Sequence, residues 1–136
     1  MYDLMIIGSG PAGISAALTA KARNLNFIWF GSRALSTKIE KAEKIMNYPG
    51  LPAVTGSEMQ SVFLKQIDDC GITITESQVN SIYDCGGYFA AGADNEIYEA
   101  KAVIMTVGMT TTREIEGEAR LLGCGVSYCA TCDGAL

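Results

Sequence analysis

The stretch Gly8-Ser9-Gly10-Pro11-Ala12-Gly13 decides the fold prediction, because it has the G-x-G-x-x-G spacing of the turn that joins a strand to a helix in dinucleotide-binding proteins. The spacing alone is weak evidence, so its surroundings matter. Residues 2–7 form a short apolar run typical of a buried parallel strand. Residues 11–23 predict a helix that begins at a proline, and residues 27–30 predict a second strand. This order predicts an α/β fold of the Rossmann type.

Each glycine of this turn has its own expected role. Gly8 permits the tight turn, Gly10 lets the backbone approach a pyrophosphate, and Gly13 lets the helix and the strand pack closely. The amides at the start of the helix, with the helix dipole behind them, then bind the anion. A purely structural glycine turn is the alternative interpretation.

The end of the second predicted strand does not identify the dinucleotide. The motif expects an acidic residue there, which binds a ribose hydroxyl, but the sequence is Phe30-Gly31-Ser32-Arg33. Ser32 can accept the hydroxyl bond. Arg33 can meet a phosphate, as in NADP-binding proteins, or it is an ordinary surface cation. This turn therefore does not distinguish FAD from NADP.

The remaining pattern predicts one more helix and several short strands. Residues 36–46 carry charges typical of the solvated face of a helix or a structured loop. An amphipathic helix follows, with Thr55 or Ser57 as its cap, and ends before Gly71. Further strands are predicted over residues 72–75, 79–83, 88–91 and 97–100, with a buried run over 102–107. The part from residue 113 onward is irregular.

Composition excludes several classes of protein. The 136 residues are enough for one domain. A net charge of −5 argues against a nucleic-acid surface, and no segment approaches the ~20 apolar residues that span a membrane. The start of the sequence has no basic region typical of a signal peptide, so we expect a cytoplasmic protein. The absence of histidine removes the commonest metal ligand and general base.

Five cysteines in such a chain favour redox or metal chemistry over a disulfide scaffold. Cys129-Ala130-Thr131-Cys132 has the redox spacing, and Asp133 directly after it can move a proton to or from a thiolate. Zinc, or a purely structural role for the pair, is an alternative. So is an iron–sulfur centre on Cys124, Cys129 and Cys132, which have the spacing of plant-type ferredoxins. Its fourth ligand would be Cys85 or Cys70. Otherwise we expect the three cysteines outside the pair to be buried or incidental.

Taken together, these segments resemble the low-molecular-weight thioredoxin reductases. The glycine turn and Cys-Ala-Thr-Cys-Asp-Gly at residues 129–134 carry the resemblance, and residues 46–52 and 103–108 look like further segments of that family. The resemblance implies a three-layer Rossmann-like FAD-binding fold, with a parallel sheet and a small antiparallel meander. It implies FAD contacts at Gly8, Ser9, Gly10, Pro11, Ala12, Gly13, Gly31, Ser32, Asn47, Thr106, Val107 and Gly108.

The resemblance also implies catalytic roles and partners. Cys132 resembles the sulfur that faces the flavin, Cys129 the thiol that attacks the disulfide of thioredoxin, and Asp133 the proton donor and acceptor. Electrons would come from NADPH or reduced ferredoxin, and the intact enzyme would be a homodimer.

Two departures from the family pattern qualify this expectation. Arg33-Ala34-Leu35-Ser36-Thr37-Lys38 stands where the family has Gly-Gly-Gln-Leu, which is more similar to the ferredoxin-linked flavin enzymes. Family members are also about twice as long. We therefore expect residues 1–112 to be the N-terminal part of an FAD-binding domain, and residues 113–136 to be a connector and the start of an inserted domain that carries the redox pair. Such a truncated fold would be inactive alone, and a non-catalytic nucleotide-binding fragment is the alternative.

Overall fold

The strand, turn, helix and strand predicted around the glycines are all present in the computed structural model. The structure describes residues 1–108, 116–121 and 124–126. Strand β1 covers Tyr2–Ile7, helix α1 covers Pro11–Ala22 and strand β2 covers Phe27–Phe30. Asn24 ends the helix in the left-handed region with φ of 55°, a conformation in which asparagine is enriched. Met1–Leu35 and Phe63–Gly108 form one compact unit, and Ser36–Val62 belongs to a second.

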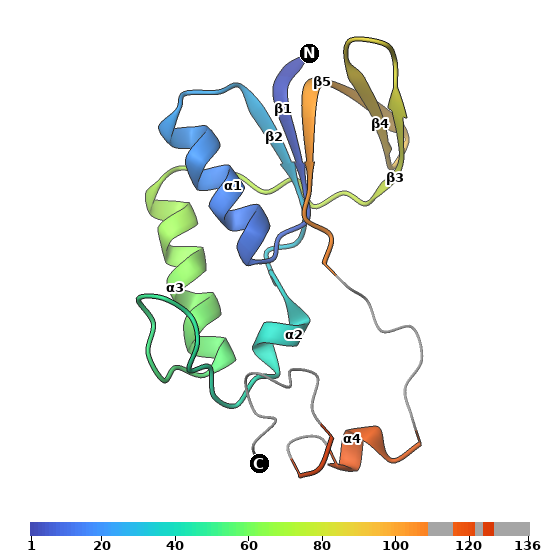
Figure 1. The fold of residues 1–136 in the computed structure, drawn as a ribbon. Coiled ribbons are helices and arrows are strands. Elements are labelled where there is room, and N and C mark those ends of the chain that lie inside the picture. Colours follow the sequence, from blue (N-terminus) through green and yellow to red (C-terminus); the bar gives the residue numbers. More distant parts are fainter. Residues whose placement is uncertain (109–115, 122–123, 127–136) are drawn as a thin grey trace. The chain divides into compact units, whose positions relative to one another are not determined.

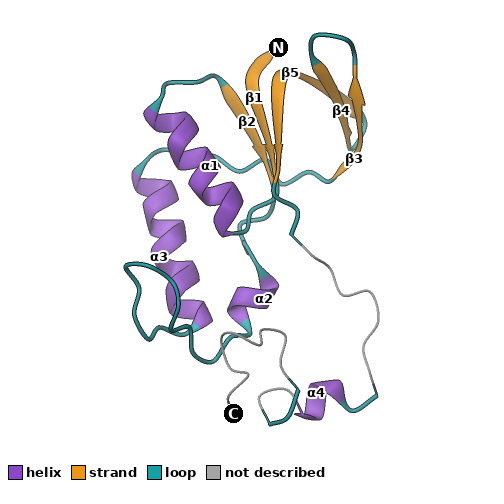
Figure 2. Cartoon of the chain, in the orientation of Figure 1, coloured by secondary structure: helices purple, strands orange, loops and turns teal. Residues whose placement is uncertain are grey.

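The five strands of the first unit form one mixed sheet in the order β2-β1-β5-β4-β3 (Figure 2). Strand β1 lies parallel to both β2 and β5, which covers Glu96–Met105. The first half of β5 instead pairs antiparallel with β4, Phe89–Ala93, and β4 pairs antiparallel with β3, Val79–Asp84. The sequence analysis predicted two separate segments, 97–100 and 102–107, where the structure has the single strand β5. This strand changes its pairing partner near Ala100, which pairs with both Tyr2 and Phe89.

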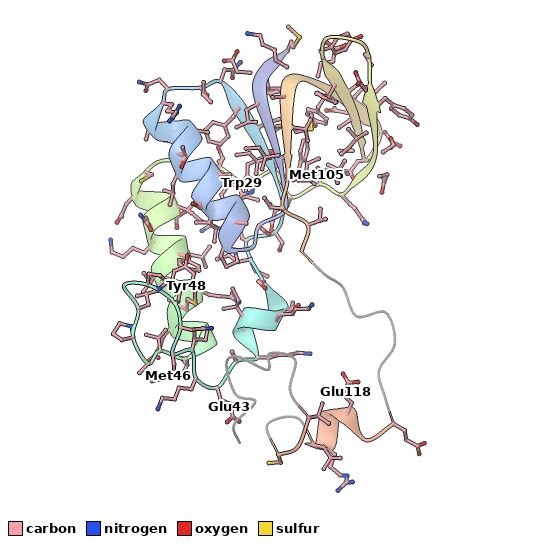
Figure 3. All side chains as sticks on the ribbon, in the orientation of Figure 1. Trp29, Glu43, Met46, Tyr48, Met105 and Glu118 are labelled. Carbon is pink, nitrogen blue, oxygen red and sulfur yellow. The ribbon has the colours of Figure 1, made fainter. Side chains whose placement is uncertain are left out.

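The parallel strands lie between α1 and the β3–β4 hairpin, as the predicted three-layer α/β fold requires (Figure 1). On the hairpin side the core contains Met5, Ile7, Ile28, Phe30, Ala91, Ala93 and Ala100. Side chains alternate along a strand, so Ile6 and Trp29 point to the opposite face of the sheet. Helix α1 covers this face, and Figure 3 labels Trp29 there. Ile6 and Trp29 are both fully buried. Strands β1 and β2 are therefore covered on both faces next to the glycine turn, where they end.

Helix α3, Gly56–Asp69, begins at a reciprocal cap. The amide of Glu58 donates to the Thr55 hydroxyl at 3.2 Å, and the amide of Thr55 donates to the Glu58 carboxylate at 2.8 Å. Of the two caps that the sequence allowed, the structure thus has Thr55.

The charged segment before α3 is mostly loop. Helix α2 covers only Thr37–Glu40, after which Ile45 and Val54 form an isolated antiparallel bridge. The lysine and glutamate side chains of residues 36–46 are exposed, as predicted. A last short helix, α4, covers Glu118–Leu121.

Two sequence predictions about strands are wrong. Residues 72–75 form no strand, since only Thr75 pairs with β2, through a parallel bridge to Phe30. The run over 102–107 is not buried, because Ile104, Met105 and Val107 at the end of β5 are exposed (Figure 3). Apolar composition alone does not say which neighbour covers a strand.

No helix in the described ranges is both long and apolar enough to cross a bilayer.

Candidate functional site

Gly8 and Gly13 allow the turn and the strands to approach more closely than any side chain would permit. Gly8 has φ of +112°, and a Cβ built on it would lie 2.3 Å from the carbonyl oxygen of Thr106. A Cβ on Gly13 would lie 2.0 Å from the carbonyl oxygen of Gly8. Contacts under 3.0 Å are essentially never seen for real Cβ atoms, so both positions require glycine.

The carbonyl oxygen of Gly8 is held by two side chains from other strands. The indole Nε1 of Trp29 donates to it at 2.8 Å, and the hydroxyl of Thr106 lies 3.0 Å away. The same hydroxyl lies 2.9 Å from the carbonyl oxygen of Ile7. Because one donor lies on β2 and the other directly follows β5, the peptide that opens the turn is fixed from two sides.

Gly10 differs from its two neighbours because the space around it is open. No atom would lie within 4 Å of a Cβ at this position. Gly10 is the N-cap of α1, with φ of −71°, and no side chain caps the helix there. The first N–H groups of a helix have no partner within the helix. An anion that approaches the backbone at Gly10 would therefore meet uncapped amides and the positive end of the helix dipole, which fits a diphosphate.

Ser9 links the turn to the end of β2. Its side chain is buried; the hydroxyl donates to the Leu35 carbonyl at 3.1 Å and accepts from the Ser32 amide at 3.0 Å. A Cβ on Gly31 would lie 2.6 Å from the Cβ of Ser9. The Ser9 side chain thus holds the glycine turn against the loop that follows β2.

Arg33 forms a bidentate ion pair with Asp68, with both N–O distances at 3.0 Å. The hydrogen bonds from Arg33 hold the pKa of the Asp68 carboxyl below its ordinary value. The backbone amide of Arg33 donates to the Glu76 carboxylate at 2.8 Å. Of the two interpretations that the sequence allowed for Arg33, this pairing favours the surface cation over the phosphate ligand.

The other predicted contact residues lie in varied surroundings. Ser32 is exposed and its hydroxyl accepts from the Ala34 amide at 3.1 Å. Val107 and Gly108 are exposed after β5. Asn47 is exposed on the loop between α2 and α3, in the second unit. The predicted catalytic residues Cys129, Cys132 and Asp133 lie outside the described residues.

The remaining cysteines are not buried. Cys70, Cys85 and Cys124 are free and exposed, so of the two expected alternatives burial does not hold, and an incidental role stays a prediction. Cys70 follows the end of α3 and Cys85 lies in the turn of the β3–β4 hairpin, both of which are surface features. Within the described ranges, no three His, Cys, Asp or Glu side chains are grouped to hold a metal ion.

Comparison with known proteins agrees with the fold and the glycine turn. The family model described as pyridine nucleotide-disulphide oxidoreductase matches residues 2–135. The chain belongs to this family. A curated member, the thioredoxin reductase of Bacillus subtilis, is 32% identical over 136 residues, which cover 99% of this chain and 43% of that protein.

Two solved oxidoreductases of this family have the same fold. A ferredoxin-flavin thioredoxin reductase from Clostridium acetobutylicum is 47% identical with a TM-score of 0.80, over 99% of this chain and 47% of that one. A thioredoxin reductase from Streptococcus pyogenes is 36% identical with a TM-score of 0.83, over 99% and 44%. The resemblance to thioredoxin reductases is thus confirmed, and the chain spans less than half the length of these relatives.

Sequence reasoning missed one side chain that holds the glycine turn and two that hold Arg33 in the loop after β2. Trp29, Asp68 and Glu76 had no predicted role, and Thr106 was predicted as a cofactor contact rather than a brace for Gly8. Only Trp29 left a signal, because a buried indole usually needs a partner for its N–H. The other two act through pairings between distant segments, which a single sequence does not reveal.

Proposed function

We propose that this chain is the dinucleotide-binding part of a thioredoxin-reductase-like oxidoreductase and that the turn at Gly8–Gly13 holds the diphosphate of FAD. The observation that carries the proposal is the contrast among three glycines in one turn. At Gly8 and Gly13 an added Cβ would lie less than 3.0 Å from backbone atoms, whereas at Gly10 it would meet no atom within 4 Å. A turn needed only for packing has no reason to keep the middle position free of a side chain.

The residues present fit the group. The amides of Gly10, Ala12 and Gly13 start the uncapped helix, while Pro11 has no N–H and occupies the first helical position. Trp29 and Thr106 fix the peptide of Gly8, and Ser9 fixes the loop after β2. Flavin, when bound and reduced, would supply the two electrons that reduce a disulfide.

The proposed redox pair is Cys129 and Cys132, with Asp133 as the proton donor and acceptor. Two residues between the thiols allow a disulfide, and a thiolate released from it can attack the disulfide of a partner protein. We propose thioredoxin as that partner, by similarity to the relatives. The 47% identity to the ferredoxin-flavin enzyme, against 36% and 32% for the other two relatives, favours reduced ferredoxin over NADPH as the donor. A division at residue 112, a homodimer and a cytoplasmic location remain predictions.

The first experiment is FAD binding. The purified chain is mixed with FAD, gel-filtered and heated, and the released flavin is counted against protein. We expect flavin in the protein fraction at a stoichiometry that rises to one per chain with FAD concentration. A folded chain that retains no FAD at millimolar concentration contradicts the proposal. Iron at about two per chain instead supports the iron–sulfur alternative.

The second experiment separates the two cysteines. Cys129→Ser leaves the thiol assigned to face the flavin, so the FAD-loaded variant is expected to absorb at longer wavelengths than wild type. Cys132→Ser leaves only the outer thiol and is expected to lack that absorbance. The matched control is Cys124→Ser, which removes an exposed thiol outside the pair. Identical spectra for all three variants contradict the assignment.

A further inference from the structure

The acid that a dinucleotide fold carries at the end of its second strand is missing here for a steric reason. Residue 31 is the first after β2, and a Cβ on Gly31 would lie 2.6 Å from the Cβ and 2.8 Å from the hydroxyl of Ser9. The Ser9 side chain is itself fixed by Leu35 and Ser32. No acidic side chain can therefore stand at position 31 while Ser9 keeps its place.

A different segment brings a carboxylate to the same edge of the sheet. Thr75 pairs in parallel with Phe30, so Glu76 is the register neighbour of Gly31. Two backbone hydrogen bonds fix this register. The amide of Thr75 donates to the Trp29 carbonyl at 2.7 Å, and the amide of Gly31 donates to the Thr75 carbonyl at 3.2 Å. Glu76 thus lies where β2 ends, at the edge to which the ligands of parallel sheets bind.

The carboxylate of Glu76 is held by one oxygen and leaves the other for a ligand. Oε1 accepts from the Arg33 amide at 2.8 Å, and among the described residues Oε2 has no hydrogen-bond donor. Glu76 is exposed, and the nearby guanidinium of Arg33 is already paired with Asp68. The amide of Ser32, one residue earlier, is bonded to Ser9 of the glycine turn. The amides of two consecutive residues, Ser32 and Arg33, are therefore bonded to the glycine turn and to Glu76, respectively.

We infer that Glu76 binds the hydroxyls of the adenosine ribose of the dinucleotide, in place of the acid that β2 lacks. This inference rests on the proposed function, because the diphosphate must lie on the glycine turn for the ribose to reach Glu76. A carboxylate oxygen accepts hydrogen bonds from a diol, and such charge-assisted bonds are stronger than neutral ones. The same charge repels a 2′-phosphate, so FAD and NAD fit this position and NADP does not.

The test removes the charge and keeps the loop. Glu76→Gln retains an amide oxygen that can accept from the Arg33 amide but lacks the second carboxylate oxygen. The matched control is Asp94→Asn, the same change at an exposed residue in the turn before β5, where that strand begins rather than where the parallel strands end. Each protein is titrated with FAD, and then with ADP and 2′,3′-dideoxy-ADP as competitors. Melting temperatures confirm that each variant is folded.

We expect wild type and Asp94→Asn to bind ADP about tenfold more tightly than the dideoxy analogue, the effect of one or two charge-assisted hydrogen bonds. In Glu76→Gln the two ligands should bind within about twofold of each other. Equal loss of both ligands, or an unchanged preference for ADP, overturns the role of Glu76 and leaves the diphosphate site standing. If folded wild type binds neither FAD nor ADP, the proposed function fails, and this inference fails with it.

Discussion

The side-chain hydroxyl of Thr106 lies 3.0 Å from the carbonyl oxygen of Gly8, although 98 residues separate the two in sequence. Thr106 directly follows β5, and Gly8 directly follows β1, which pairs in parallel with β5. The same carbonyl accepts the indole N–H of Trp29 on β2. All three parallel strands therefore converge on one peptide, so the shape of the glycine turn depends on strands far apart in the chain.

Removal of the Thr106 hydroxyl is expected to weaken the turn. Thr106→Val keeps the side-chain volume and loses a hydrogen bond to the backbone, which is worth about 1 kcal/mol in the free energy of unfolding. Urea denaturation followed by circular dichroism measures the loss. Thr106→Ser keeps the hydroxyl and is the matched control. Equal stability of the valine and serine variants would show that the hydroxyl does not brace Gly8.

Trp29 and Thr106 are expected to couple, because both donate to the Gly8 carbonyl. Trp29→Phe loses the indole N–H and part of a fully buried side chain, at a cost of about 2 kcal/mol or more. The double variant Trp29→Phe/Thr106→Val leaves that carbonyl with neither donor, so its loss should exceed the sum of the single losses by about 0.5 kcal/mol or more. Strict additivity in a urea double-mutant cycle would contradict a shared role.

The contact between Gly31 and Ser9 predicts a compensating pair of substitutions. Gly31→Ala alone forces a Cβ to within 2.6 Å of the Ser9 Cβ and should destabilise the protein by about 1–3 kcal/mol. Ser9→Gly removes the atoms in the way. The double variant Ser9→Gly/Gly31→Ala should therefore be more stable than the two single losses predict, as thermal unfolding would measure. If Gly31→Ala alone melts like wild type, the steric account of the missing acid is wrong.

Acid stability should depend on Asp3. Its carboxylate accepts from Lys101 Nζ at 2.6 Å and from the Asn26 amide at 3.1 Å, and the Lys101 bond is the main reason that its pKa lies below the ordinary value. A carboxyl with a lowered pKa stabilises the fold above its unfolded pKa of about 3.9 and loses this contribution as pH falls through the folded value.

The stability difference between wild type and Asp3→Asn should consequently be larger at pH 7 than at pH 2.5, in urea titrations at both values. Lys101→Met should reduce the same pH dependence, because it removes the cation. A difference that is equal at the two pH values would exclude this pair as a source of acid sensitivity.

The sequence predicts the first thirty residues well because their structure is local. The apolar runs, the glycine spacing and Pro11 determine β1, the turn, α1 and β2 without reference to the rest of the chain. Reciprocal capping by Thr55 and Glu58 is local too. The predicted strand at 72–75 and the predicted burial of 102–107 depend instead on which neighbour pairs with or covers each segment. Both predictions were wrong, because 72–75 forms only one bridge and Met105 is exposed.

The same distinction applies to the candidate site. The separate roles of Gly8, Gly10 and Gly13 follow from their spacing, and the structure shows two crowded positions and one open one. The position of Glu76 follows from a single bridge between Thr75 and Phe30, and no local pattern marks it. Non-local register therefore brings a carboxylate to the strand end at which the sequence shows none.

The most direct test of the central claim is the affinity for FAD of Gly10→Ala. A Cβ at Gly10 meets no protein atom within 4 Å and its φ of −71° suits alanine, so the free energy of unfolding should change by less than about 1 kcal/mol. The same methyl group would occupy the space that a diphosphate needs. Gly13→Ala, whose Cβ would lie 2.0 Å from the Gly8 carbonyl oxygen, is the contrasting variant that should lose stability.

We expect folded Gly10→Ala to bind FAD at least about tenfold more weakly than wild type in calorimetric titration. Equal FAD affinity in the two folded proteins would contradict the claim that the backbone at Gly10 holds the diphosphate.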